Sequence, residues 1–362
     1  MATKYLSGNR LQGTAAERTA LNLSSPPATS WKELGRTTLT STNDSIDVSS
    51  FAAKDNLMIL CNVINSGGDF RTFWRFNSDT NSNYSQRYNT NGGSDSTNTS
   101  LNGTMDWNTA ESVQSFEVLN ITNIASQEKL GIKRKIGSNT AGAGNAPNRA
   151  EIVGKWANTS NQITSVSVGD AVDPKSGTGG IGSEVVVLGC DNDEADSGTN
   201  FWQELASVTL GSDGDLIDSN TFTAKKYLMI EAIGYRTNAS IIPALRVGNG
   251  TLDTGSNYAR RQSVNGGSDG TVTGQSSMGG DSGAGYLTHD VYFIINKSDK
   301  EKLIINECII TASGAGSAPD RAEIVGKWAN TSAQINRVGY LNVGGGSSDF
   351  GSGSSLKVWG AD

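Results

Sequence analysis

Residues 150–160 read AEIVGKWANTS, and residues 322–332 read the same eleven letters. Other landmarks recur in the same order, with an offset between 171 and 174 residues. They pair Trp31-Lys32-Glu33-Leu34 with Trp202-Gln203-Glu204-Leu205, Asn91-Gly92-Gly93-Ser94-Asp95 with Asn265-Gly266-Gly267-Ser268-Asp269, and Leu188-Gly189-Cys190-Asp191 with Trp359-Gly360-Ala361-Asp362. Residues 31–191 and 202–362 are therefore two copies of one 161-residue unit, which we call the first and second repeats. Solenoid repeats run only about 20–50 residues, so a unit of this length has the size of a whole domain.

The composition favours an all-β fold. Gly occurs 44 times, charged residues make up 18% of the chain, and short apolar runs alternate with Gly, Ser, Asn and Asp clusters. This pattern is typical of antiparallel sheets packed face to face. We therefore expect two tandem antiparallel β-sandwich domains of jelly-roll type, related by internal duplication. An extended N-terminal arm, residues 1–30, precedes them, and residues 192–201 link them.

Several classes of partner and location are disfavoured. No apolar run approaches the roughly 20 residues that span a bilayer, and MATKYLSGNRLQG lacks the apolar stretch of a signal peptide. A net charge of −7 argues against nucleic acid or an anionic membrane as partner. Cys61, Cys190 and Cys308 have no cysteine at the matching positions of the other repeat. We expect them to be free, buried thiols in a chain made in a reducing host cytoplasm.

Apolar runs and turn clusters predict about ten strands in each repeat. In the first repeat they are residues 33–39, 45–48, 57–64, 70–77, 84–88, 112–121, 130–136, 149–156, 163–168 and 184–188. In the second they are residues 204–210, 216–218, 227–235, 241–247, 258–263, 287–295, 303–311, 321–328, 335–343 and 355–359. The runs at 57–64 and 227–235 are apolar almost throughout, which indicates central strands buried on both faces.

The duplicated segment alternates as a strand, with one face made of Ala150, Ile152, Gly154 and Trp156. This face is expected to enter the core. The opposite face retains its charged residues in both repeats, namely Arg149, Glu151, Lys155, Arg321, Glu323 and Lys327. One interpretation is a ladder of ion pairs on a solvated face, worth about 0–1 kcal/mol per pair. The alternative is a contact between the repeats or between subunits, which makes these residues candidate assembly contacts.

Residues 1–30 contain no strand-length apolar run. Thr14-Ala15-Ala16-Glu17 resembles a helix capping box, and Pro26-Pro27 extends the chain after it. An isolated helix this short is marginal in water, so we expect the arm to be held by another surface. That surface is either the body of its own domain or another virion protein or subunit. The candidate docking residues are Tyr5, Leu6, Arg10 and Leu11.

Residue types that carry catalysis are scarce. His289 is the only histidine, which disfavours a catalytic triad or a histidine metal site. Several carboxylates recur in both repeats, which favours turn and strand roles over a single active site. We expect no enzyme activity and no cofactor. Calcium at the acidic residues 191–196 is a weaker alternative, because the spacing lacks the glycine of a known calcium loop.

Two stretches near the start of the chain carry a family resemblance. They are Lys4-Tyr5-Leu6-Ser7-Gly8-Asn9-Arg10-Leu11-Gln12-Gly13 and the Trp-x-Glu-Leu-Gly-Arg-Thr-Thr-Leu start at residues 31–39. Both resemble sequences of virion-associated proteins of marine tailed phages. Residues 76–84, 91–95 and 144–160 are similar to the same group, so the resemblance covers nearly the whole chain. It implies a virion location more strongly than a particular role. The second repeat departs from the pattern where Ala206-Ser207-Val208 replaces Gly-Arg-Thr. A contact made by Arg36 is therefore expected to be missing there.

These features favour a non-enzymatic virion structural protein at the capsid surface, in a head fibre or in the tail. One alternative is a major capsid protein built from two jelly rolls. Another is an adhesin that binds host surface glycans through the variable loops 102–111 and 171–182, with Trp107 as a candidate exposed aromatic residue. A homo-oligomer is expected, most simply a trimer, because three-fold positions occur in shells and fibres alike.

Overall fold

A computed structural model describes residues 31–68, 70–104, 112–170, 177–191, 200–235, 242–279, 287–311, 315–316, 318–344 and 349–362. Every named element in these ranges is a β-strand, and every named strand pairing is antiparallel. The predicted all-β class is therefore confirmed. Within the same ranges, no helix has the length and apolar character needed to cross a membrane. The predicted docking residues in 1–30 lie outside the described residues.

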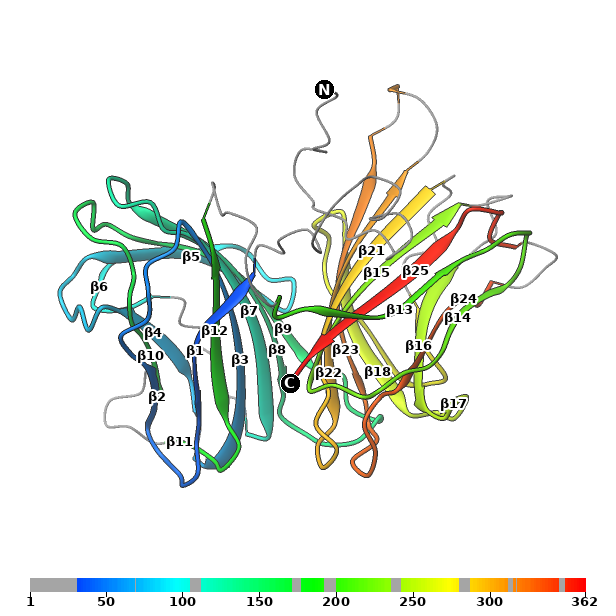
Figure 1. The fold of residues 1–362 in the computed structure, drawn as a ribbon, viewed down its shortest axis with the longest axis horizontal. Coiled ribbons are helices and arrows are strands. Elements are labelled where there is room, and N and C mark those ends of the chain that lie inside the picture. The colour runs from blue at the N-terminus through cyan, green and yellow to red at the C-terminus, as the bar shows by residue number, and fades with distance from the viewer. Residues whose placement is uncertain are drawn as a thin grey trace, which may run out of the picture.

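The first repeat contains a large sheet and a small one (Figure 1). The large sheet has the order β1 (Lys32–Thr38), β12 (Glu184–Cys190), β3 (Asn56–Gly67), β7 (Gln114–Thr122), β8 (Lys129–Ser138), β9 (Asn148–Trp156), β5 (Tyr84–Thr90) and β6 (Ser96–Leu101), and β11 (Thr178–Gly179) also pairs with β3. The small sheet has the order β2 (Ser45–Val48), β10 (Val166–Asp170) and β4 (Thr72–Phe76).

The second repeat has the same plan. Its large sheet has the order β13 (Gln203–Thr209), β25 (Ser355–Ala361), β15 (Tyr227–Tyr235), β21 (Leu287–Ile295), β22 (Lys302–Thr311), β23 (Asp320–Trp328), β18 (Tyr258–Val264) and β19 (Gly270–Gln275). Its small sheet has the order β14 (Leu216–Thr221), β24 (Arg337–Asn342), β16 (Pro243–Asn249) and β17 (Thr251–Leu252), and β20 (Met278–Gly279) pairs with β16. The duplicated strand is β9 in one repeat and β23 in the other, and both occupy the sixth position of the large-sheet order.

Each repeat is a sandwich, because one core fills the space between its large and small sheets. In the first repeat this core joins Ile46, Trp74 and Val168 of the small sheet to Ile59, Ile152 and Trp156 of the large sheet. In the second it joins Ile217, Leu245 and Tyr340 to Ile230, Ile324 and Trp328. Ala150, Ile152 and Trp156 are each 1% exposed, so the predicted inward face of the duplicated strand is confirmed. The three cysteines are free and buried, as expected.

Local chemistry explains two recurring sequence signals. Asn91-Gly92 and Asn265-Gly266 all have positive φ and begin the five-residue loops between β5 and β6 and between β18 and β19, where the Gly93 N–H donates to the Thr90 carbonyl at 2.9 Å and the Gly267 N–H donates to the Val264 carbonyl at 2.9 Å. The core tryptophans are tied to aspartates in the same way in both repeats. Trp156 Nε1 donates to Asp79 Oδ2 at 2.8 Å, and Trp328 Nε1 donates to Asp253 Oδ2 at 2.7 Å.

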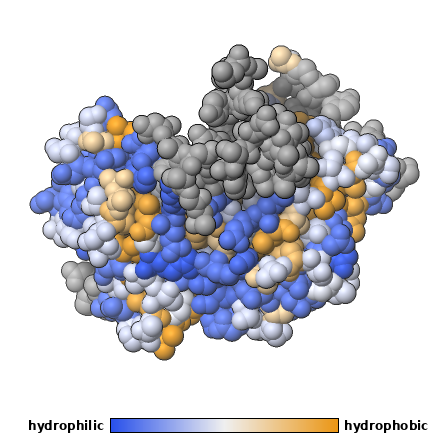
Figure 2. Space-filling view, in the orientation of Figure 1, coloured by the Kyte–Doolittle hydropathy of each residue, from blue (hydrophilic) through white to orange (hydrophobic). Residues whose placement is uncertain are grey.

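The sequence-based prediction missed the strands β6 and β19 at the edge of each large sheet. Both are polar and largely exposed, so they carry no alternation of apolar and polar residues. They are held by pairing with their hairpin partners β5 and β18. The described surface in Figure 2 is mostly hydrophilic, with apolar residues in small separate groups.

Candidate functional site: the junction between the repeats

The large sheets of the two repeats pack against each other through their outer faces. A third buried apolar cluster contains Met58, Leu60, Phe116, Val118, Ile136, Val186 and Leu188 of the first repeat, together with Tyr227, Ile295, Leu303, Ile305, Val325 and Ala361 of the second. Phe201, the last linker residue, and Trp202, the first residue of the second repeat, also belong to it. The molecule therefore has four layers, in the order small sheet, large sheet, large sheet and small sheet (Figure 1).

This junction explains why the central strands are apolar on both faces. Along β3, Leu57, Ile59 and Cys61 point into the sandwich, whereas Met58 and Leu60 point into the junction. The two alternating sets together give the continuous apolar run seen in the sequence.

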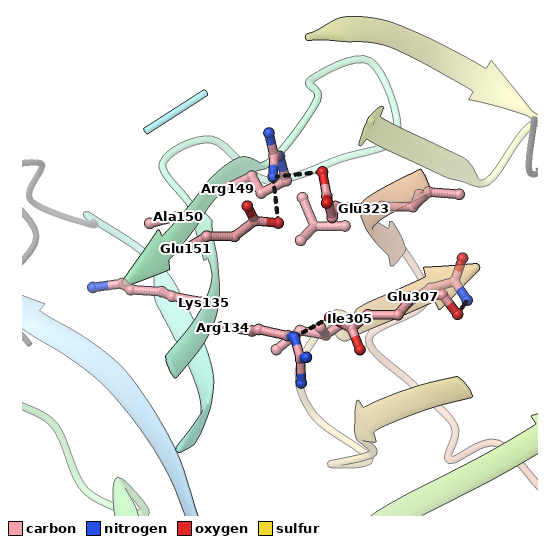
Figure 3. Close-up of a pocket in the computed structure, with 11 residues that line it drawn as sticks. Arg134, Lys135, Arg149, Ala150, Glu151, Ile305, Glu307 and Glu323 are labelled. Atoms are coloured by element: carbon pink, nitrogen blue, oxygen red, sulfur yellow. Dashed lines mark hydrogen bonds and ion pairs between the residues drawn. The ribbon is translucent and has the colours of Figure 1, made fainter. Parts of the chain in front are cut away.

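Arg149 lies at the centre of the polar part of the junction (Figure 3). Its side chain is only 4% exposed, and its Nη2 atom lies 2.7 Å from Oδ1 of Asp269 in the second repeat. Its Nη1 atom lies 2.7 Å from Glu151 Oε1 and 3.8 Å from Glu323 Oε2. One buried guanidinium thus bridges carboxylates from both repeats.

Equivalent residues meet near Arg149. Arg134 of β8 forms an ion pair with Glu307 of β22, and these two occupy matching positions of the two repeats. Glu323 is 12% exposed, and burial together with the nearby Glu151 carboxylate raises its pKa above the ordinary value. The crevice that these residues line has room for about one water molecule, so it is far too small for a small-molecule ligand.

Lys327 forms a second polar contact across the junction. Its ammonium group is fully buried and donates to the Thr140 carbonyl at 2.7 Å and to Glu301 Oε2 at 3.2 Å. Glu301 in turn accepts a hydrogen bond from the backbone N–H of Gly142 at 2.5 Å. Burial lowers the pKa of Lys327. The Lys327–Glu301 ion pair lies within the second repeat. It holds the loop between β8 and β9 of the first repeat through hydrogen bonds to the backbone of Thr140 and Gly142.

Glu184 forms a third contact. Its side chain is 2% exposed and accepts hydrogen bonds from the Tyr227 hydroxyl at 2.6 Å and from Lys226 at 3.1 Å. Arg36 lies 3.3 Å from the same carboxylate and also donates to the backbone carbonyl of Asp362. Burial alone would raise the pKa of Glu184, but hydrogen bonds from Thr38 and Tyr227 and the nearby cations hold it below the ordinary value. Arg36, for which the sequence predicted no counterpart in the second repeat, thus contributes to the junction.

The remaining predicted contact residues lie differently. Lys155 has a side chain 43% exposed and pairs with Glu128 of its own repeat at 3.0 Å. Arg321 is 62% exposed and pairs with Glu323. The structure therefore brings Arg149, Glu151, Glu323 and Lys327 to the junction and leaves Lys155 and Arg321 at the surface. Trp107 and most of the two predicted glycan-binding loops lie outside the described residues.

Each sandwich core also contains a buried carboxylate at the same sheet position, which the sequence reasoning missed. Glu117 is fully buried, with Lys133 Nζ at 3.0 Å from one oxygen and Lys135 Nζ at 3.2 Å from the other. The two lysines lie on the inward face of β8, whereas the apolar Leu130, Ile132 and Ile136 lie on its outward face, so the apolar alternation of this strand marks the opposite face. Burial would raise the pKa of Glu117, but the two ammonium groups hold it below the ordinary value.

In the second repeat, uncharged hydrogen-bond donors surround the carboxylate in place of lysines. Asp290 pairs with Ala232 as Glu117 pairs with Cys61, and it accepts hydrogen bonds from Tyr340 at 2.7 Å and Asn306 at 3.2 Å. Burial raises the pKa of Asp290. The two cores therefore satisfy a carboxylate at one position in two chemically different ways.

The predicted calcium segment is only partly described. The Asp191 carboxylate accepts from Lys54 Nζ at 2.7 Å and from the backbone N–H of Asp55 at 3.0 Å, while residues 192–196 lie outside the described residues. Across the described ranges, no group of three or more His, Cys, Asp or Glu side chains is arranged to hold a metal ion.

No family model and no curated protein matches this chain. Among solved structures it is similar to domains LG4-5 of the mouse laminin alpha1 chain, with 10% sequence identity and a TM-score of 0.19 over 93% of this chain and 92% of that chain. It is also similar to the outer membrane protein OprG from Pseudomonas aeruginosa, with 5% identity and a TM-score of 0.11 over 86% of this chain and 99% of that chain. With TM-scores this low, neither likeness supports an inference about this chain.

Proposed function

We propose that this chain is a non-enzymatic structural protein of a phage virion, located at the capsid surface, in a head fibre or in the tail. The observation that carries the proposal is the role of residues 144–160, the longest string that resembles virion-associated phage proteins. The same string supplies β9 and Arg149, which bridges to Asp269 of the second repeat. The residues that carry the resemblance thus include one that joins the two sandwiches within the chain, which supports a structural role.

The electrostatics of the junction support a structural role as well. Arg149, Glu184 and Lys327 are each almost fully buried and each is engaged by oppositely charged groups of the protein. Removing one partner of such a pair leaves an uncompensated buried charge and is strongly destabilising. These side chains hold β-sheets together rather than projecting into a pocket of ligand size.

A major capsid protein is the second candidate. The observation that favours it is the side-by-side packing of two similar sandwiches in one chain. Shells built from tandem jelly rolls, and proteins that decorate them, are present in hundreds of copies, whereas a fibre or tail component is present in far fewer.

Quantitative mass spectrometry of purified phage particles tests both candidates. We expect this chain to copurify with intact particles at a fixed ratio to the major shell protein. A copy number in the hundreds favours the shell or its surface, and a small multiple of three favours a fibre or tail component. Absence from washed particles, with the chain present in the infected-cell lysate, contradicts the proposal.

A further inference from the structure

An apolar face remains exposed at one side of the junction. Leu130, Ile132 and Val153 are 55%, 52% and 47% exposed on β8 and β9, and Ile309 is 50% exposed on β22. We call these four residues the open face.

The open face has a buried counterpart in the same molecule. Strand β8 pairs with β9 as β22 pairs with β23, so Ile132 corresponds to Ile305 and Val153 corresponds to Val325. Ile305 and Val325 are each only 3% exposed, because the first repeat covers them. The same surface is therefore covered in one repeat and uncovered in the other.

The covered residues lie where the two large sheets are packed together, and the open face lies where the junction between them opens. Strands β8 and β22 cross it in opposite directions, since Ser138 lies by Glu301 at one end and Arg134 meets Glu307 further along. Because the strands run in opposite directions, Ile132 and Ile309 both lie on the side of that ion pair away from the Ser138–Glu301 contact. In Figure 1 the two large sheets are closest in the lower half of the view and diverge toward the top.

We infer that the open face is the docking site of this chain's own N-terminal segment, residues 1–30. The described chain begins at Trp31, which packs against the apolar cluster of the junction, and the Trp31 carbonyl accepts from Phe201 N at 3.0 Å. The segment thus leaves the fold at the junction itself.

The segment is long enough to reach the open face. Trp31 precedes β1, and β1 lies four strands from β8 in the large sheet. At about 4.8 Å per strand this is about 20 Å, which roughly six extended residues span. A tethered segment is also present at an effective concentration on the order of millimolar, so a modest contact suffices.

The chemistry of the segment suits the open face. Apolar side chains such as Leu21 and Leu23 match its walls, and the segment carries three basic residues against one acidic in a chain of net charge −7. Glu128 and Glu151, with side chains 41% and 34% exposed, lie on the same outer face of the first repeat. Four half-exposed residues are far less than the roughly 800 Å² per partner that a stable interface between chains buries. Of the alternatives that the sequence left open, the geometry therefore favours this chain's own tethered segment over a second copy or another virion protein.

Limited trypsin digestion of the full chain tests this inference independently of the virion proposal. Trypsin cleaves after Lys4, Arg10 and Arg18, so a docked segment is cut only when it is released. We expect Ile132→Glu to raise the initial cleavage rate after Arg18 about ten-fold, because it places a charge on the docking surface. The matched control is Ile181→Glu, which alters an isoleucine 66% exposed elsewhere in the first repeat and should leave the rate unchanged.

The double variant Leu21→Ser with Leu23→Ser changes only the segment and should raise the cleavage rate in the same way with no change in the melting temperature of the sandwiches. Equal cleavage rates in the wild type, the arm variant and Ile132→Glu overturn the inference. Light scattering at several concentrations gives the other decisive outcome. If Ile132→Glu dissociates an oligomer while cleavage after Arg18 stays unchanged, a second copy covers the open face and the inference is wrong.

Discussion

Strands β9 and β23 have the same sequence from Ala to Trp and the same place in their sheets, yet their outer faces differ. Val153 is 47% exposed and Val325 is 3% exposed, and the side chain of Lys155 is 43% exposed whereas that of Lys327 is fully buried. Because the local sequence is identical, it cannot be the cause of the difference. The cause is the packing of the first repeat against one of the two strands. Paired substitutions at equivalent positions therefore measure what the junction contributes, with the intrinsic preference of the strand held constant.

The largest contrast is expected for a charge placed at the valine. Val325→Asp puts a carboxylate into the apolar centre of the junction and should lower the free energy of unfolding by about 4 kcal/mol or more. Val153→Asp, on the half-exposed side, should lower it by less than about 1 kcal/mol. Urea unfolding of the two full-length variants measures the difference. Equal losses would mean that the strand, and not the junction, sets the penalty.

The lysine pair should give the next largest contrast. Lys327→Ala leaves Glu301 buried without its cation, which is expected to destabilise the chain by about 3 kcal/mol. Lys155→Ala removes a surface ion pair with Glu128 and is expected to change stability by less than about 1 kcal/mol. The double-mutant cycle of Lys327→Ala with Glu301→Gln isolates the pairwise energy. A coupling energy near zero there would show that the buried pair makes no net contribution.

A third contrast compares the arginines that precede the duplicated segment. Arg149→Ala should destabilise the chain by about 2 kcal/mol, because Asp269 is 1% exposed and loses its closest charged partner. Arg321→Ala removes a side chain 62% exposed and should change stability by about 0.5 kcal/mol or less. If the two variants unfold at the same urea concentration, the bridge across the junction is not a stabilising interaction.

The sequence predicted one face of the duplicated strand and not the other, for a physical reason. Period-two alternation identified the inward residues Ala150, Ile152 and Trp156, because a sandwich core always takes one face of each strand. No property of Val153 or Val325 distinguishes the two, since exposure of an outer face depends on distant chain segments. The retained charges at Arg149 and Lys327 allowed either a solvated ladder of ion pairs or a contact, and the choice among solvent, a second repeat and a second subunit needed tertiary structure.

Charged residues in the cores were harder to predict. Lys133 and Lys135 point into the core, but Leu130, Ile132 and Ile136 alternate on the opposite face of β8, so the pattern of this strand predicts exposed lysines. Only the pairing of β7 with β8, which sets Glu117 opposite Lys135, shows how the charges are compensated. Such pairing between strands depends on register and cannot be inferred from one strand alone.

The smallest expected effect concerns pH and compares two buried glutamates of the junction. The pKa of Glu323 is raised in the folded protein, so its contribution to stability is present below the unfolded value and is lost as pH rises through the folded pKa. The pKa of Glu184 is lowered, so its contribution is present above the unfolded value and is lost as pH falls through the folded pKa. Glu323→Gln should therefore be neutral or slightly stabilising at pH 7 and lose this advantage near pH 4, whereas Glu184→Gln should be destabilising at pH 7 and nearly neutral at the acid end.

Urea midpoints measured from pH 4 to pH 8 test both signs, and parallel pH profiles for the two variants would contradict the opposite shifts. Glu184 has the Tyr227 hydroxyl and two cations around its carboxylate, whereas Glu323 shares the cation of Arg149 with other carboxylates. Opposite dependences of stability on pH would therefore show that the junction stabilises the charge of Glu184 and not that of Glu323.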